Sequence, residues 1–398
     1  MTEMFLLGAG ASVEAGIPDA YGMTRVMLES VAADDENRYR RLDKVLQFVV
    51  GGLLFQQGVR GENPYDGVNI EDLFNAIILL GERHHSDLGP FISSWHPQLM
   101  GFESGRLTTS ASRGLLEAIF EPVQDYVRQI GGRWRPARID TFSSSHVFEP
   151  RFADAVRQVV IGGEGRLFKA AADAMILKLV GMVWITDPAR VAYLTPLVRH
   201  ANVSNSTVVT LNYDNSIELA GQVTGVAVDT GFDSWSDTGE FGFEEGKVPL
   251  LKLHGSIDWA LSDGVITEAR PLPFQVIKKV SPNADEPQGL HPAVVFGGKN
   301  KLTAKGPFLG LLRAFDRALS SASSLWAIGY SFRDEHVNEF ITKWFNGEPT
   351  RQVIIVNPRR DTIDKGLARD LLEGHGQTRV RVVESTAAMG ISELGARG

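Results

Sequence analysis

The chain has 398 residues, a formal net charge of −8, 41 glycines and no cysteine. Its 43% hydrophobic residues suffice for a full core, so global disorder is excluded, and no stretch resembles an uncharged membrane span of about 18 apolar residues. The missing thiols exclude disulfides, thiol catalysis and every cysteine-built zinc or iron–sulfur site. The acidic balance argues against a nucleic-acid surface, and the N-terminus has no basic signal region. We expect a cytoplasmic protein of two or three domains, or of one domain with a large insertion.

The N-terminal segment predicts a buried strand that ends in a glycine turn. Met4–Leu7 is apolar and leads directly into Gly8-Ala9-Gly10-Ala11-Ser12. Gly16-Ile17-Pro18-Asp19 follows, and Thr24–Ala33 then has a helical composition.

Residues from about 35 to 205 predict an α-helical block, because strand signals are scarce there. Asn69 can cap one of these helices, with Asp72 reaching back as in a capping box. Pro122 should kink another, and Pro188 suits the first turn of the last. The helical patterns cover Arg38–Gln57, Leu73–Leu80, Gly114–Ile130, Arg166–Ile185 and Pro188–Ala201.

From about residue 206 the pattern changes to short apolar runs that alternate with helices, as in βαβ units with a mostly parallel sheet. The apolar runs are Thr207–Leu211, Val226–Asp229, Val248–Leu253, Leu325–Ile328, Val353–Val356 and Arg379–Val383. The helical stretches are Ser216–Gln222, Phe308–Ser320, Asp334–Phe345 and Arg360–Leu372. Asp233–Gly246 and Arg270–Pro307 are expected to form loops or a small module.

These patterns predict a Rossmann-like, doubly wound, mostly parallel α/β domain with a large α-helical insertion. Residues 1–23 and 206–398 would form the α/β domain, and residues 24–205 the insertion. The insertion then offers a surface for oligomerisation or regulation.

The glycine turn after the first strand has two interpretations. A strand, Gly8-Ala9-Gly10 and a helix would let backbone N–H groups approach a pyrophosphate near the positive end of the helix. However, position 13 is Val and the third glycine falls at 16, so the full dinucleotide fingerprint is absent. The alternative is a tight strand–helix turn that binds no ligand. Gly16-Ile17-Pro18-Asp19 can likewise be an ordinary helix boundary without a ligand.

Two further predicted strands end in polar residues. Asn212 and Asp214 follow Thr207–Leu211 directly, and ligands of doubly wound sheets bind at the carboxyl ends of strands. His254 is the only one of nine histidines that terminates a predicted strand and precedes a glycine. A histidine there is suited to general-base catalysis, although histidines are more often surface or packing residues.

The last two strand ends are also typical of nucleotide sites. Gly329-Tyr330-Ser331 offers glycine and hydroxyl groups beside a predicted helix N-terminus. Asn357 places an amide where a ribose hydroxyl could be recognised. Plain turn chemistry is the alternative for both.

Together these motifs resemble the sirtuin NAD-binding fold, in the same order along the chain. The resemblance implies a phosphate and nicotinamide loop formed by Gly8, Ala9, Gly10, Ala11, Ser12, Pro18 and Asp19. It also implies that Asn212, Asp214 and His254 match the Asn, Asp and catalytic His motifs of the family. Gly329 and Ser331 would replace a Gly-Thr-Ser motif, and Asn357 would bind the adenosine ribose. Asn212 and His254 are the expected catalytic residues.

The residues of these motifs are more similar to those of the sirtuin-like NAD+ hydrolases of antiphage defence than to those of other sirtuins. Asn212-Tyr213-Asp214, Leu253–Trp259, Ile328–His336 and Asn69–Asp72 carry this resemblance. Zinc-binding sirtuin deacylases have a four-cysteine module after the His motif, whereas residues 262–307 contain no cysteine. The resemblance therefore implies a zinc-free enzyme that takes NAD+ as substrate and hydrolyses it to nicotinamide and ADP-ribose in abortive infection.

Such an enzyme should be kept inactive until infection. The resemblance implies regulation by self-assembly into a homo-oligomer, by the helical insertion, or by a HerA-type ATPase partner. Two other functions stay open, namely an NAD-dependent protein deacylase and a non-catalytic NAD or ADP-ribose sensor.

Overall fold

The computed structural model describes residues 2–33, 42–61, 67–82, 168–268, 271–280, 292–294, 307–359, 363, 366–374 and 376–395. The chain divides into two compact units: unit 1 is Met1–Gly22 with Leu179–Gly398, and unit 2 is Met23–Lys178. The predicted helix at Gly114–Ile130 lies outside the described residues, as does much of Arg270–Pro307. None of the described helices is long and apolar enough to cross a membrane.

Unit 1 is built on a seven-stranded sheet in the order β10-β9-β8-β1-β2-β4-β3, and every pair of neighbours is parallel. The chain order reverses on either side of β1, which makes this strand a topological switch point. The predicted doubly wound sheet is confirmed. The strands are β1 (Glu3–Leu7), β2 (Thr207–Thr210), β3 (Val228–Asp229), β4 (Val248–Lys252), β8 (Ser324–Ile328), β9 (Gln352–Val356) and β10 (Val380–Val383).

Six of these strands end on one line across the sheet. Leu7 pairs in register with Thr210 on one side and with Ile328 on the other. The same row continues from Thr210 to Lys252, and from Ile328 through Val356 to Val383. The residues that follow these six positions therefore share one edge of the sheet.

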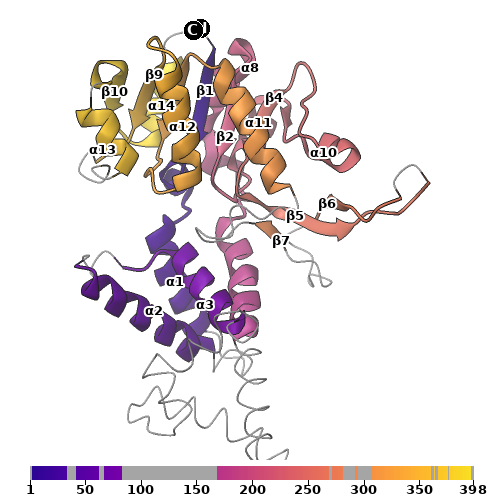
Figure 1. The fold of residues 1–398 in the computed structure, drawn as a ribbon, viewed down its shortest axis with the longest axis vertical. Coiled ribbons are helices and arrows are strands. Elements are labelled where there is room, and N and C mark those ends of the chain that lie inside the picture. The colour runs from indigo at the N-terminus through magenta and orange to yellow at the C-terminus, as the bar shows by residue number, and fades with distance from the viewer. Residues whose placement is uncertain are drawn as a thin grey trace, which may run out of the picture. The chain divides into compact units, whose positions relative to one another are not determined.

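Helices cover both faces of the sheet, and Figure 1 shows α11 and α12 side by side across one of them. On the opposite face, the Phe5 ring meets His200 of α8 edge-on, and His200 Nε2 lies 2.6 Å from Glu3 Oε2. The helices of unit 1 are η1 (Ala9–Ala15), η4 (Pro188–Leu194), α8 (Thr195–Ser204), α9 (Ser216–Thr224), α10 (Phe232–Thr238), α11 (Phe308–Ser321), α12 (Glu335–Gly347), α13 (Gly366–Glu373), η6 (Gln377–Arg379) and α14 (Ala387–Gly395).

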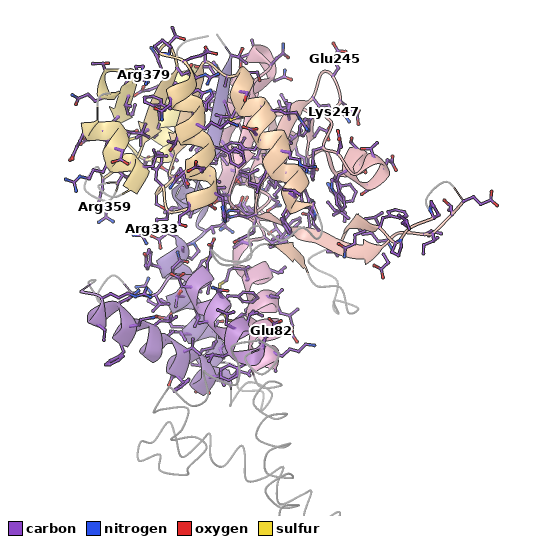
Figure 2. All side chains as sticks on the ribbon, viewed as in Figure 1. Glu82, Glu245, Lys247, Arg333, Arg359 and Arg379 are labelled. Atoms are coloured by element: carbon purple, nitrogen blue, oxygen red, sulfur yellow. The ribbon has the colours of Figure 1, made fainter. Side chains whose placement is uncertain are left out.

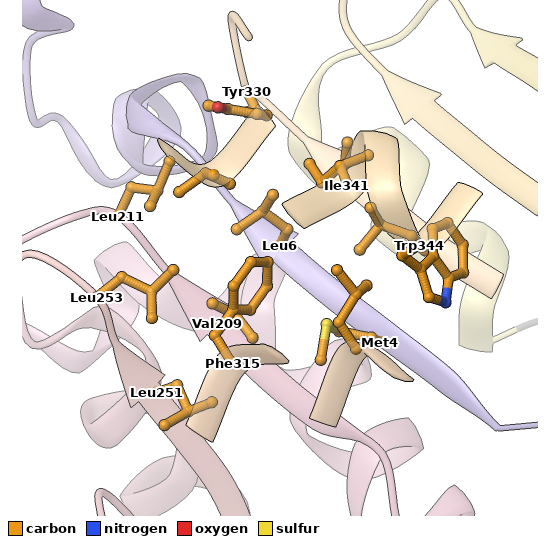
Figure 3. Packing of buried hydrophobic residues seen from close by; sticks show 14 of the residues in the cluster. Met4, Leu6, Val209, Leu211, Leu251, Leu253, Phe315, Tyr330, Ile341 and Trp344 are labelled. Atoms are coloured by element: carbon orange, nitrogen blue, oxygen red, sulfur yellow. The ribbon is translucent and has the colours of Figure 1, made fainter. Parts of the chain in front are cut away.

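Alternation along the strands builds the core beneath α11. Met4 and Leu6 of β1, Val209 of β2 and Leu251 of β4 point to the same face, where Phe315 of α11 packs among them (Figure 3). All five are buried, and each such side chain contributes about 1.5–3 kcal/mol when it leaves water. This core holds the strand ends rigidly in place.

A second, antiparallel sheet of three strands follows β4 in the order β6-β5-β7. Its strands are β5 (Gly255–Asp263), β6 (Gln275–Lys279) and β7 (Pro292–Val294). In Figure 1 the β5–β6 hairpin projects from the side of the large sheet. Strands β6 and β7 lie in the segment Arg270–Pro307, which was predicted to form loops or a small module.

Two predictions for unit 1 are wrong. Asp233–Gly246 was expected to form a loop or a small module, yet Asp233–Thr238 belongs to the helix α10, because Gly231 and Gly239 take the left-handed conformation and cap both ends of it. Pro188–Ala201 was expected to be one helix. It forms the 3₁₀ helix η4 and then α8, which begins anew with Pro196 in its first turn.

Unit 2 is helical where it is described. Its elements are α1 (Ala20–Ala32, which begins in unit 1), α2 (Leu42–Val59), α3 (Ile70–Glu82) and the helical residues 168–178. Asn69 Oδ1 accepts a hydrogen bond from Glu71 N at 2.8 Å, which confirms the predicted cap. Leu46, Leu73 and Ile77 supply buried apolar side chains from α2 and α3.

Candidate functional site

The glycine turn after β1 packs directly against the turn after β8. Gly8 N donates to Ile328 O, and Gly10 N donates to Gly329 O, each at 3.0 Å. A Cβ atom on Gly8 would lie 2.6 Å from Gly329 O, and Gly329 itself has a φ of +61°. These three glycines therefore allow the backbones of two turns to touch at the switch point. That packing role is additional to any contact with a ligand.

Asn212, Ser12 and Asp214 form one hydrogen-bonded network beyond the ends of β1 and β2. Asn212 Nδ2 donates to Ser12 Oγ at 2.8 Å and to Gly8 O at 2.9 Å. Ser12 Oγ in turn donates to Asp214 Oδ2 at 2.7 Å. Both amide hydrogens of Asn212 are thereby used, so its side-chain oxygen is the atom that can orient a ligand hydroxyl or a water.

Lys252 supports this network from inside the protein. Its side chain is fully buried, and Nζ donates to Asp214 O at 2.6 Å and to Glu218 Oε1 at 2.7 Å. A buried ammonium is costly without such partners. Lys252 therefore fixes the backbone of the loop that carries Asn212 and Asp214.

His254 lies at the same edge. Thr210, the last residue of β2, pairs with Lys252, the last residue of β4. Asn212 comes two positions after Thr210, and His254 comes two positions after Lys252. The register therefore brings the two predicted catalytic residues to neighbouring strand ends. The His254 side chain is 7% exposed, and its ring centroid lies 6.2 Å from that of Tyr213.

The two ring nitrogens of His254 have different surroundings. Nε2 lies 2.8 Å from Asp334 Oδ2, whereas Nδ1 is buried and has no hydrogen-bond partner among the described residues. A buried polar atom without a partner is rare in proteins and points to a ligand or a water. Nδ1 is therefore the ring nitrogen that no hydrogen bond of the described residues already uses.

Asp334 was not among the predicted site residues. It caps α12, because its Oδ1 accepts hydrogen bonds from His336 N at 3.1 Å and Val337 N at 3.2 Å. The sequence signal was an aspartate at the start of a predicted helix, which indicates a cap but not a contact 80 residues away.

Four further predicted site residues, Pro18, Asp19, Ser331 and Asn357, are exposed or half-buried. Ser331 is exposed directly after the β8 turn, and Asn357 is half-buried after β9, where its Oδ1 accepts from Arg359 N at 2.9 Å. Asp19 is exposed and accepts from Gly22 N at 2.8 Å at the start of α1, beside the half-buried Pro18. Each local bond is ordinary turn or cap chemistry, and each residue also leaves polar or apolar surface for a ligand.

Two side chains of η4 hold the loop after β1. Tyr193 OH donates to Ala11 O at 2.5 Å, and Arg190 Nε donates to Ala15 O at 2.6 Å. Burial, together with the carboxylates of Asp214 and Glu14, raises the pKa of Tyr193 above its ordinary value. Sequence reasoning missed both residues, because nothing in their helical pattern indicates a contact with the first strand.

Two exposed arginines follow β8 and β9. Arg333 comes after β8 and lies over the Tyr21 ring at 5.1 Å, while Arg359 comes after β9. Figure 2 shows both on the same end of unit 1. Within the part of the chain that the structure describes, no group of three or more His, Asp or Glu side chains is arranged to hold a metal ion.

Fold and site together define a doubly wound α/β domain with a polar site at its switch point. Residues 206–378 match the family model of the SIR2-like domain. This match covers the strand ends that carry Asn212, His254, Gly329 and Asn357, whereas the glycine turn after β1 lies outside it.

Solved sirtuin structures are distantly similar to the chain. A structure of Sir2Tm bound to a propionylated peptide has 10% sequence identity and a TM-score of 0.37, over 100% of this chain and 93% of that one. A Sir2 homolog in complex with NAD has 12% identity and a TM-score of 0.38, over 100% and 88%. No curated protein matches the sequence.

Proposed function

We propose that the protein is an NAD+ hydrolase, which cleaves NAD+ to nicotinamide and ADP-ribose. The observation that supports this best is the buried Nδ1 of His254, which has no hydrogen-bond partner among the described residues. At the neighbouring strand end, Asn212 uses both amide hydrogens within the protein, so only its side-chain oxygen can bind a ligand. The SIR2-like match over residues 206–378 supports NAD+ as the substrate.

The chain's own residues can account for binding. Gly10 and Ser12 follow β1, Gly329 and Ser331 follow β8, and Asn357 follows β9, so one dinucleotide can extend along this edge from the switch point. Ala9, Ala11, Pro18, Asp19 and Asp214 complete the proposed binding set. Arg333 and Arg359 add positive charge for the pyrophosphate.

In the proposed reaction, Asn212 orients the attacking water or a ribose hydroxyl, and His254 accepts the proton that this oxygen loses. Water adds to the ribose carbon as its bond to nicotinamide breaks. The electron pair of that bond neutralises the pyridinium nitrogen, so no general acid is required. The proton accepted by His254 is then released to solvent, which balances the reaction. Asp214 can offset positive charge that develops on the ribose.

We further propose the biological setting that the motif resemblance implies. The enzyme would act in the cytoplasm as an effector of abortive infection and be held inactive as a homo-oligomer or by a HerA-type ATPase. The helical insertion, which was predicted at residues 24–205 and of which Met23–Lys178 forms a separate unit, would carry the regulatory contacts. Co-purification with an ATPase encoded beside it is the test of that partnership, and failure to co-purify would count against it.

The test of the activity is NAD+ consumption by the purified full chain, alone and with the ATPase. His254→Ala and Asn212→Ala should each lower the rate at least about 100-fold, as expected for loss of a catalytic base or of substrate orientation. His200→Gln is the matched control, because His200 lies against Glu3 at the opposite end of β1 and should leave the rate unchanged. Wild-type rates in both site variants would contradict the assignment.

The same assay separates the alternatives. A deacylase would release nicotinamide only when an acyl-lysine peptide is present. A sensor would bind NAD+ or ADP-ribose without consuming NAD+ under any of these conditions.

A further inference from the structure

The hydrogen bond between His254 and Asp334 determines which ring nitrogen of His254 carries the hydrogen. His254 follows β4 and Asp334 caps α12, 80 residues further along the chain, and their side chains are 7% and 5% exposed. Water therefore competes little for this hydrogen bond. Its direction depends on which of the two side chains can donate.

Asp334 can only accept. Its Oδ1 already accepts from two backbone N–H groups of α12, and the positive end of that helix favours the ionised carboxylate. An ionised carboxylate has no hydrogen to give, so the 2.8 Å contact requires a hydrogen on His254 Nε2. In the neutral imidazole the other nitrogen, Nδ1, then carries the lone pair.

We infer that Asp334 is a positioning residue that fixes His254 in the Nε2–H tautomer, so that Nδ1 is the atom that accepts the proton in the reaction. This inference rests on the proposed function for the role of Nδ1, but not for the tautomer itself. The absence of any partner for Nδ1 among the described residues agrees with it. Asp334 does not touch the reacting atoms and acts only through the imidazole.

The geometry supplies a selective variant, Asp334→Asn. Asparagine is as good a helix cap as aspartate, and its Oδ1 can keep the two bonds to His336 N and Val337 N. Its amino group then replaces Oδ2 and faces Nε2. Because that group donates, it requires a lone pair on Nε2 and moves the hydrogen to Nδ1. The cap and the volume are kept, whereas the tautomer is inverted.

The experiment combines long-range ¹H–¹⁵N NMR of the histidine-labelled full chain with NAD+ turnover. The His254 signals are assigned by their loss in His254→Ala. The wild type should show hydrogen on Nε2, and Asp334→Asn should show it on Nδ1, with an unchanged melting temperature. The turnover number of Asp334→Asn should fall by about 10²–10⁴-fold, since inversion of a catalytic histidine tautomer has that order of effect. The KM should change little, since Asp334 lies behind the imidazole.

Two results would overturn the inference: hydrogen on Nδ1 in the wild type, or an inverted tautomer in Asp334→Asn with undiminished turnover. Asp334→Ala serves as the second variant, because it removes the cap and the acceptor together and should lower stability as well as turnover. If the wild type shows the Nε2–H tautomer but consumes no NAD+ under any condition, the proposed function fails while the tautomer assignment stands.

Discussion

Lys252 Nζ and Glu218 Oε1 lie 2.7 Å apart, and the lysine side chain has no exposed surface. The pair joins the first turn of α9 to the last residue of β4, directly beneath the loop that carries Asn212 and Asp214. Lys247 and Glu244 make an ion pair of the same length on the surface, where Lys247 is labelled in Figure 2. The two pairs differ in burial and in the second hydrogen bond of Lys252 to Asp214 O, so the surface pair is a control for an exposed ion pair alone.

Lys252→Met should therefore lower the free energy of unfolding by about 3 kcal/mol at neutral pH, because it leaves the half-buried Glu218 carboxylate and the buried Asp214 carbonyl without their donor. Lys247→Met should leave it nearly unchanged, as for most exposed pairs. The loss in Lys252→Met should shrink in mild acid. Burial raises the pKa of Glu218, and removal of the ammonium raises it further, so acid neutralises the group that has lost its partner. Urea unfolding of both variants at two pH values measures this, and equal effects would contradict it.

Tyr193 gives a pH dependence at the alkaline end. Burial, Asp214 and Glu14 raise its pKa above the ordinary 10.0, so the folded protein keeps the phenol proton where the unfolded chain loses it. The stability that Tyr193 contributes is then complete below pH 10 and falls as the pH rises above it. Tyr193→Phe cannot ionise and should lack this component.

The measurement is the difference in unfolding free energy between wild type and Tyr193→Phe from pH 8 to pH 11. The wild type should be the more stable below pH 10, because of its hydrogen bond to Ala11 O, and its advantage should decrease above that pH. An advantage that grows with pH would mean that the phenolate is stabilised in the folded state.

Local patterns predicted most of unit 1 well. Met4–Leu7 and Val353–Val356 are fully apolar runs, and Thr207–Leu211 is apolar except for its two threonines. All three have the length that a buried parallel sheet requires, and the structure differs there by at most one residue. Short elements were less predictable. Helix α10 depends on two left-handed glycines that read equally well as loop residues.

The candidate site was predictable in part for the same reason. Asn212 and His254 directly follow strands, so a parallel sheet is enough to bring their ends together. Asp334 and Tyr193 act at long range, and the direction of a side chain across 80 or 182 residues is set by packing that no local pattern encodes. Lys252 was read as part of a strand, and only the register shows that it is enclosed.

Gly329 should tolerate no side chain. It has a φ of +61°, and a Cβ atom there would collide with the backbone of Gly10 and Ala11. Gly246 has a similar φ of +81° but open space around it. Gly246→Ala should cost only the strain of the left-handed conformation, about 1–2 kcal/mol.

Gly329→Ala adds separation of the two turns to that strain, so it should cost clearly more, about 3 kcal/mol or above, and abolish NAD+ consumption. Denaturant midpoints of the two variants check the difference. Similar losses would show that the turns after β1 and β8 are not packed as tightly as the structure has them.

Variants of Ser12 and Ser331 distinguish a residue that positions the catalytic residues from one that contacts the substrate. Ser12 is buried, accepts from Asn212 Nδ2 and donates to Asp214 Oδ2, so Ser12→Ala leaves two polar groups without a partner. We expect a loss of about 1–3 kcal/mol in stability and a lower turnover number, because the Asn212 amide is no longer held in one orientation. Ser331 is exposed, so Ser331→Ala should leave the stability unchanged.

If Ser331 contacts NAD+ as proposed, Ser331→Ala should raise KM by about 3–10-fold with little change in the turnover number, since a neutral hydrogen bond is worth about 0.5–1.5 kcal/mol and serves substrate and transition state alike. Initial rates over a range of NAD+ concentrations distinguish the two effects. A change confined to KM in Ser12→Ala would contradict its positioning role, because the network of Ser12, Asn212 and Asp214 would then bind substrate without orienting the reacting groups. An unchanged KM in Ser331→Ala would remove that residue from the proposed binding set.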